Sequence, residues 1–204
     1  QLNREKGSRE ELPCRVQGQR PCWSPEAKPL AGSRGSAPWV PLMKGKKVMR
    51  LSTSTCMYFN RPDGTKASIL DSVRTLGQAG YRVLDMNFHD LSVFDTPFKT
   101  PQWETLIHQA KDIADEMGIE FSQGHLHFYN FCAPNTPDKE FLDELIRRGI
   151  EGGRILGIKW LVIHAATDFD SVTPVRDSKR KTIEYLKPRI ELAGKYGVGI
   201  AVEN

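Results

Sequence analysis

The chain has 204 residues, of which 39% are hydrophobic and 26% charged, so it can bury a core and is not disordered throughout. It lacks the apolar run of roughly 18 to 20 residues that spans a bilayer, and the apolar segment of a secretory signal. These absences argue against a membrane protein or a Sec-exported protein. The four cysteines show no CxxC spacing and suit a reducing compartment, so we expect a cytoplasmic protein.

The net charge of +4 is unevenly distributed along the chain. Residues 1–46 hold nine basic and four acidic side chains, whereas residues 47–204 hold 20 basic and 21 acidic ones. The second part therefore shows no basic face typical of nucleic-acid binding. Residues 1–46 carry six of the 13 prolines and no apolar periodicity, which predicts a disordered or non-native N-terminal extension. A natural start at Met43 or Met49 would place that extension outside the native protein.

From Lys47 onward, apolar β-rich runs alternate with stretches of helical periodicity. The runs predict strands over residues 48–58, 81–88, 119–128, 159–165 and 198–203. The 3.6-residue spacing predicts helices over residues 69–76, 103–117, 142–150 and 183–193. We expect four glycines to end these helices in a left-handed conformation: Gly80, Gly118, Gly157 and Gly197. Thr100-Pro101 and Thr136-Pro137 are typical of helix starts, with each threonine as the cap.

Strands that are linked by helices run parallel, and two architectures fit this order. Residues 47–204 could be the first five strands of a (β/α)8 TIM barrel, or a complete open doubly wound sheet of five strands. The chain stops at Asn204, directly after an apolar strand and without a closing helix. We therefore expect an α/β fold that is a TIM barrel truncated after strand five.

Polar side chains gather where the predicted strands end. They are Asp85, Asn87, His89, Asp90, Gln123, His125, His127, His164, Glu203 and Asn204. The carboxyl ends of parallel strands meet on one face, so these groups should converge. His108 is the one histidine placed within a helix, where we expect a surface position.

Two of these residues directly follow buried apolar runs. His164 ends Trp160–Ile163 and Glu203 ends Ile200–Val202, where an ionisable group is costly unless it is hydrogen-bonded or bound to a metal. Imidazole and carboxylate together are ligands for Zn²⁺ or Mn²⁺. A structural, hydrogen-bonded role fits any single histidine equally well, whereas the position of Glu203 favours function.

Three segments resemble successive strand ends of the xylose-isomerase-like barrel superfamily: Phe121–Asn130, Leu161–His164 and Gly199–Asn204. That superfamily contains sugar phosphate isomerases and epimerases, hydroxypyruvate-isomerase-like proteins and zinc-dependent apurinic endonucleases. The resemblance covers about residues 48–204. It implies the N-terminal part of the barrel, with histidines from strands three and four and a glutamate and asparagine from strand five.

The resemblance also implies roles for individual residues. Glu203 matches a glutamate that binds a divalent metal (Mn²⁺, Zn²⁺, Mg²⁺ or Co²⁺) and moves a proton, and His164 matches a second metal neighbour. Four residues would bind substrate: Asp85, His125, His127 and Asn204. His127 has the strand parity of His125 and could take its place. The remaining ligands of the family come from strands six to eight, so we expect the chain as given to be inactive.

Among the branches of the superfamily, we favour an isomerase or epimerase of a small sugar or sugar phosphate. The reaction would be proton transfer next to a carbonyl, with a metal-stabilised enediolate and Glu203 as one of two carboxylates. Two alternatives stay open: a zinc-dependent phosphodiesterase acting on abasic DNA, and a catalytically silent sugar-binding relative. The near-neutral charge of residues 47–204 disfavours a nucleic-acid partner. We expect no membrane partner, and a homo-oligomer stays open.

Overall fold

The computed structural model describes residues 50–58, 65–133, 135–165 and 175–203. The structure divides after Lys46, and every described residue belongs to the unit Lys47–Asn204. The disorder predicted for residues 1–46 and the substrate-binding role predicted for Asn204 therefore lie outside the described residues. Within the described ranges, no helix combines the length and the hydrophobicity that crossing a membrane requires.

A single parallel sheet forms the centre of this unit, with its strands in sequence order. The strands are β1 (Ser52–Ser54), β2 (Val83–Asn87), β3 (Glu120–His125), β4 (Trp160–His164) and β5 (Gly199–Glu203). A doubly wound sheet reverses its strand order at a switch point, and this sheet has no reversal among the described strands. Successive right-handed crossovers in one direction place the helices on one face, as in a barrel. The predicted barrel topology is thus confirmed, and the doubly wound alternative is wrong.

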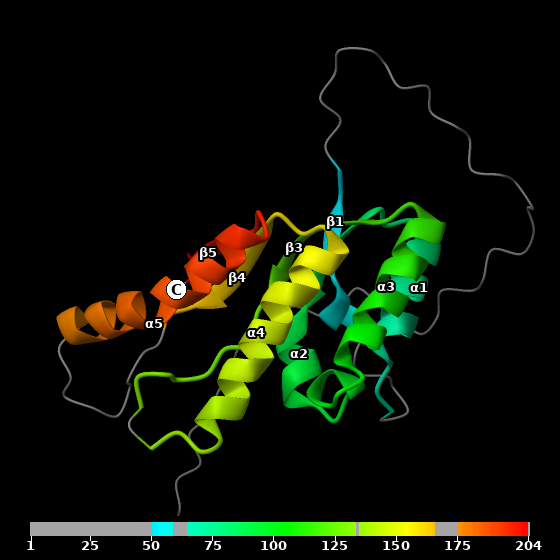
Figure 1. The fold of residues 1–204 in the computed structure, drawn as a ribbon. Coiled ribbons are helices and arrows are strands. Elements are labelled where there is room, and N and C mark those ends of the chain that lie inside the picture. Colours follow the sequence, from blue (N-terminus) through cyan, green and yellow to red (C-terminus); the bar gives the residue numbers. More distant parts are fainter. Residues whose placement is uncertain (1–49, 59–64, 134, 166–174, 204) are drawn as a thin grey trace, which may run out of the picture. The chain divides into compact units, whose positions relative to one another are not determined.

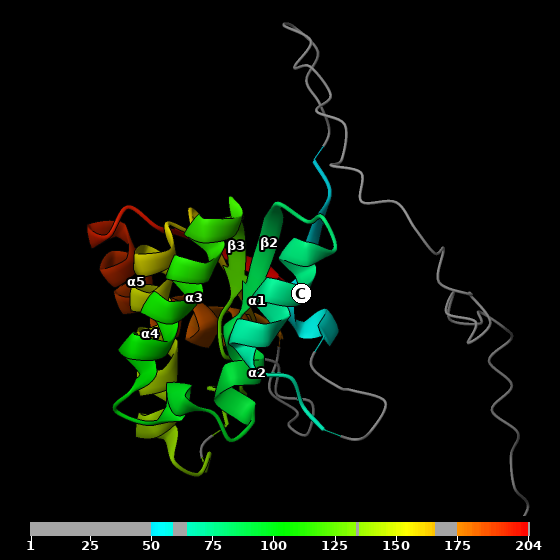
Figure 2. The same cartoon turned by 90° about the vertical axis from the view of Figure 1, so that its right-hand side faces the viewer.

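The helices form one layer. They are α1 (Ile69–Gln78), α2 (Phe88–Val93), α3 (Trp103–Met117), α4 (Lys139–Leu156) and α5 (Val175–Lys195), with short 3-10 helices η1 (Thr55–Tyr58) and η2 (Pro97–Lys99). α1 packs on α3, α3 on α4 and α4 on α5, so the helices follow the order of the strands (Figure 1). Figure 2 shows α1 and α3 on the side of β2 and β3 that faces the viewer.

The core lies between this helical layer and the sheet. Alternate strand residues point to the helices and are buried, among them Leu84, Met86, Phe121, Leu161 and Ile163. The intervening residues occupy the other face, which would be the interior of a barrel. The same alternation that builds the core therefore sends Asp85, His125 and Glu203 to the opposite side of the sheet.

Most predicted boundaries agree with the structure, and the four glycines do adopt positive φ, from 63° at Gly118 to 100° at Gly80. The threonine caps are wrong. α3 and α4 begin after Gln102 and Asp138, without a capping side chain, because the hydroxyl of Thr100 bonds within its own turn and that of Thr136 bonds to the carbonyls of Asn130 and Ala133. The first strand is shorter than expected, and α2 was not predicted because a six-residue helix has too little periodicity.

Candidate functional site

The face of the sheet opposite the helices brings together three side chains from β2, β3 and β5. Nδ1 of His125 lies 2.8 Å from Oδ2 of Asp85, and Nε2 of the same ring lies 3.4 Å from Oε2 of Glu203. The imidazole therefore sits between two carboxylates. One carboxylate is buried and the other is open, since the side chains of Asp85 and Glu203 are 9% and 55% exposed.

His164 adds a fourth group beside these three. It ends β4 and pairs in register with Glu203 of β5, so the two residues project from neighbouring strands at the same level. We call Asp85, His125, His164 and Glu203 the strand-end cluster. The sequence predicted that these four residues converge, and the structure places them at the same end of the sheet.

A bulge in the pairing of β2 and β3 aligns part of this cluster. Leu84 pairs with Phe121, but Asp85 pairs with Gln123, so β3 contains one extra residue at this point. The shift puts Gln123 on the same face as Asp85, and the Gln123 side-chain amide donates to Asp85 Oδ2 at 3.0 Å. Bulges are common beside active sites because they redirect a side chain without changing the rest of the strand.

The expectation that His127 has the strand parity of His125 is wrong, while its substrate-binding role stays a prediction. β3 ends at His125, and the alternation of faces stops with it. The ring of His127 is buried, 6% exposed, and stacks against His89 with centroids 5.2 Å apart. Neither of its nitrogens has a hydrogen-bond partner among the described residues. Burial, followed by the charge of His89, lowers the pKa of His127 to about 4.

Phe128 links the histidines into one aromatic group, which the sequence did not predict. Its ring stacks on His89 with centroids 3.8 Å apart, and it lies 4.4 Å from the ring of His164. The ring is 38% exposed, so part of it faces solvent beside the strand-end cluster. Burial lowers the pKa of His89, and the charges of His164 and His125 lower it further. These effects favour the neutral form of His89, and the aromatic group can contact an apolar face of a ligand.

The donor atoms of the strand-end cluster match a divalent cation in type. Glu203 and His164 offer a carboxylate and an imidazole, which Zn²⁺ and Mn²⁺ accept as ligands. However, no three metal-ligating side chains of the described residues are grouped closely enough to hold an ion. Two residues can thus contribute to a metal site, and a complete site needs further ligands.

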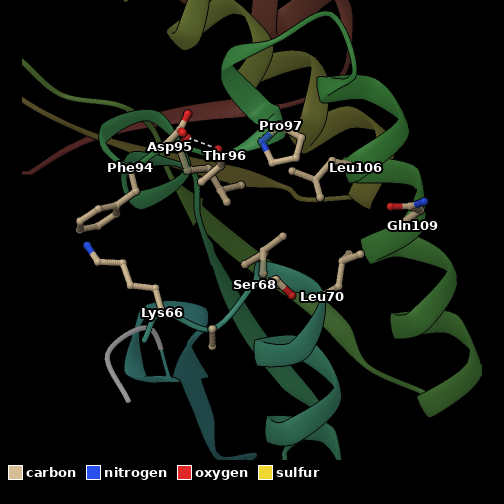
Figure 3. A pocket seen from close by; sticks show the side chains of 12 residues that line it. Lys66, Ser68, Leu70, Phe94, Asp95, Thr96, Pro97, Leu106 and Gln109 are labelled. Atoms are coloured by element: carbon tan, nitrogen blue, oxygen red, sulfur yellow. Dashed lines mark hydrogen bonds between the residues drawn. The ribbon is translucent and has the colours of Figure 1, made fainter. Parts of the chain in front are cut away.

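A separate cavity of about 650 Å³ lies between residues 65–70 and the segment from Phe94 to Pro97 (Figure 3). Leu70 and Leu106 contribute to its largely apolar lining, and Nζ of Lys66 stands 3.1 Å from the centroid of the Phe94 ring. None of the residues predicted as site residues lines this cavity. The strand-end cluster and the cavity are therefore different features of the molecule.

Comparisons with known proteins agree with this geometry. A family model described as "Xylose isomerase-like TIM barrel" matches residues 73–204. A D-tagatose 3-epimerase-like protein superposes with a TM-score of 0.57 at 18% identity, covering 76% of this chain and 53% of its own. D-psicose 3-epimerase, solved in the presence of D-fructose, superposes with a TM-score of 0.55 at 10% identity. The match covers 76% of this chain and 52% of that protein. The 3-keto-D-glucoside 4-epimerase from E. coli superposes with a TM-score of 0.54 at 15% identity. The match covers 76% of this chain and 56% of that protein.

These similarities are similarities of fold, because all three identities are low. The chain spans about half the length of the solved structures that it matches. No protein with a curated description matches the sequence.

Proposed function

Because the chain belongs to the xylose isomerase-like TIM barrel family, we propose that it forms part of an isomerase or epimerase of a small sugar or sugar phosphate. One observation carries the proposal: an exposed carboxylate, Glu203, meets an imidazole, His125, at the carboxyl end of the sheet. The structures compared above support it, since three of them are named as sugar epimerases or as similar to one. The chain spans half of such barrels, so the reaction is proposed for a complete barrel that contains it.

In the proposed reaction, Glu203 takes a proton from the carbon next to the sugar carbonyl. Its exposed side chain can reach a substrate at the carboxyl end of the sheet, where barrel enzymes bind their ligands. Nε2 of His125 stands beside the carboxylate and would contact a sugar hydroxyl. A positioned general base of this kind typically contributes about 10²- to 10⁴-fold to the rate.

A divalent cation bound in part by Glu203, with His164 beside it, would act as a Lewis acid that stabilises the enediolate. Phe128 would contact the apolar face of the sugar ring and exclude water from one side of the cluster. His89, neutral through burial beside the other histidines, would keep this region free of a further positive charge.

Deuterium exchange tests the proposal directly. A complete barrel is incubated in D₂O with a panel of ketoses and aldoses, with Mn²⁺, Mg²⁺, Co²⁺ or Zn²⁺, and exchange next to the carbonyl is followed by NMR. We expect exchange with the unmodified protein and a loss of at least about 100-fold in Glu203→Gln, which keeps the volume but removes the basic oxygen. Glu120→Gln is the matched control, because Glu120 lies at the other end of β3 and pairs with Arg50 on the surface.

Two results would contradict the proposal. One is exchange in Glu203→Gln at more than about a tenth of the unmodified rate, since loss of a general base costs far more. The other is the absence of exchange with every sugar and ion of the panel in a folded barrel that does cleave a duplex containing an abasic site.

A further inference from the structure

The contact between Asp85 and His125 has a consequence for how the imidazole is used. We propose that Asp85 is a positioning residue: it holds the proton of His125 on Nδ1, so that Nε2 presents its lone pair beside Glu203. This replaces the substrate-binding role expected for Asp85. The effect of Asp85 on turnover rests on the proposed function, whereas its effect on the tautomer of His125 does not.

The first observation is the geometry of the contact. An ionised carboxylate only accepts hydrogen bonds, so the 2.8 Å separation of Oδ2 and Nδ1 requires the proton on Nδ1. Gln123 donates to the same oxygen at 3.0 Å and fixes the orientation of the carboxylate. The side chain of Asp85 is only 9% exposed, which leaves it almost no surface for a sugar.

The second observation is the bulge in β3. In an uninterrupted pairing, Asp85 would stand opposite Ser122, and Gln123 would point toward the helices with Met86. The extra residue instead puts Gln123 and His125 on the face of Asp85. The backbone irregularity and the hydrogen bonds thus serve the same arrangement, in which the buried carboxylate of Asp85 is flanked by two donors from the next strand.

The third observation is the energetic cost of Asp85. Its Oδ1 is buried and has no hydrogen-bond partner among the described residues. A buried carboxylate oxygen without a partner destabilises a fold, so stability alone does not explain an aspartate at this position. Residues that break a local rule of stability are expected at functional sites.

The position of the proton decides what His125 can do. With the proton on Nδ1, a neutral imidazole has its acceptor at Nε2, 3.4 Å from Glu203. Nε2 would then accept the hydrogen bond of a substrate hydroxyl while Glu203 takes the carbon-bound proton. With the other tautomer, Nε2 would donate to Glu203 and occupy the oxygen that the reaction needs.

The tautomer can be measured without any substrate. The full chain is labelled with ¹⁵N-histidine, and long-range ¹⁵N–¹H spectra at alkaline pH show which ring nitrogen carries the proton. The signal of His125 is assigned by its loss in His125→Gln. We expect the Nδ1–H tautomer in the unmodified chain. In Asp85→Ala the acceptor of the Nδ1 proton is lost, so the Nε2–H tautomer, which can donate to Glu203, should appear.

Asp90→Ala is the matched control, because it removes a carboxylate just beyond the end of β2 that makes no hydrogen bond to a described histidine. It should leave the His125 signal unchanged. An Nε2–H tautomer in the unmodified chain would overturn the proposal, as would an unchanged Nδ1–H tautomer in Asp85→Ala. If Asp85→Ala does not fold, Asp85→Leu is measured in its place, because leucine fills the position of the carboxylate without an acceptor, and the same two outcomes apply.

Kinetics separate this proposal from the proposed function. In a complete barrel that exchanges deuterium, Asp85→Ala should lower kcat by at least about 100-fold with little change in KM, since a catalytic imidazole in the wrong tautomer loses up to about 10⁴-fold in a serine protease. A raised KM with an unchanged tautomer would show that Asp85 binds substrate. A tautomer switch in a barrel without activity would leave the positioning role standing and count against the proposed function.

Discussion

Phe131 and Tyr185 stack face to face, with ring centroids 3.8 Å apart and planes inclined by 8°. Phe131 belongs to the segment after β3, and Tyr185 lies in the middle of α5. The Tyr185 hydroxyl also donates to Oδ1 of Asp143 in α4, and Tyr129 donates to the same oxygen at 2.6 Å. The segment that follows His127 thus contacts α4 through the Asp143 carboxylate and α5 through Tyr185.

Removal of the Tyr185 hydroxyl should loosen this attachment. In Tyr185→Phe the ring still stacks on Phe131, but Asp143 loses a donor, so we expect unfolding by urea to show a loss of about 1–2 kcal/mol. Tyr196→Phe is the matched control, because no hydrogen bond of its hydroxyl is found among the described residues. Equal stabilities of the two variants would show that the hydroxyl of Tyr185 contributes nothing.

Replacement of His127 by leucine should stabilise the protein. The change removes two buried nitrogens without partners at similar volume, so we expect a gain of about 1–3 kcal/mol near pH 7.5. The pKa of His127 falls from 6.5 to about 4 on folding, so between these values the unfolded chain binds a proton that the folded chain does not. The native protein therefore loses stability as the pH falls through this window, and the variant does not.

The advantage of His127→Leu should accordingly grow by about 1 kcal/mol between pH 7.5 and pH 5.5, measured by urea unfolding at each pH. His108→Leu, at an exposed position of α3, controls for the replacement of a histidine by leucine as such. A less stable His127→Leu at both pH values would mean that the nitrogens of His127 are satisfied.

Two helical glycines should respond oppositely to alanine. At Gly152 in α4, a Cβ would lie 2.9 Å from the ring of Phe88, which is fully buried and cannot move aside. We expect Gly152→Ala to cost about 1–3 kcal/mol despite the higher helix propensity of alanine. At Gly194 in α5, a Cβ meets no atom within 4 Å, so Gly194→Ala should add up to about 1 kcal/mol. The measurement is the thermal unfolding of both variants. A Gly152→Ala variant more stable than the unmodified protein would contradict the close packing of α4 on Phe88.

His164→Ala distinguishes the branches of the family. In a sugar isomerase or epimerase, His164 would neighbour the reacting atoms, so its loss should be milder than that of Glu203→Gln. In a zinc phosphodiesterase, His164 would bind the ion, and both variants should lose activity alike. The measurement is the activity of the two variants in a complete barrel at saturating metal, followed both by deuterium exchange on a sugar and by cleavage of a duplex that contains an abasic site. Equal losses would contradict the assignment to the isomerase branch.

The helices, the strands and the convergence of the polar residues could be predicted from the amino-acid sequence. The apolar spacing of Trp103–Met117 marks α3 to the residue, and the glycines before the strands mark where helices end, because both depend on local geometry. The positions of Asp85, His125, His164 and Glu203 at strand ends follow from the parallel order, which helical connections dictate.

Which of these residues are in contact could not be predicted without the folded sheet. The separation of His125 from His127 depends on where β3 ends, and the pairing of Asp85 with His125 depends on a bulge that exists only between two strands. The order β1 to β5 likewise required the folded sheet, since the same run of elements also fits a doubly wound fold. Periodicity in the sequence indicates which face of a strand or helix a residue occupies. Contacts between strands that are distant in sequence depend instead on the register and curvature of the sheet, which result from the packing of the core.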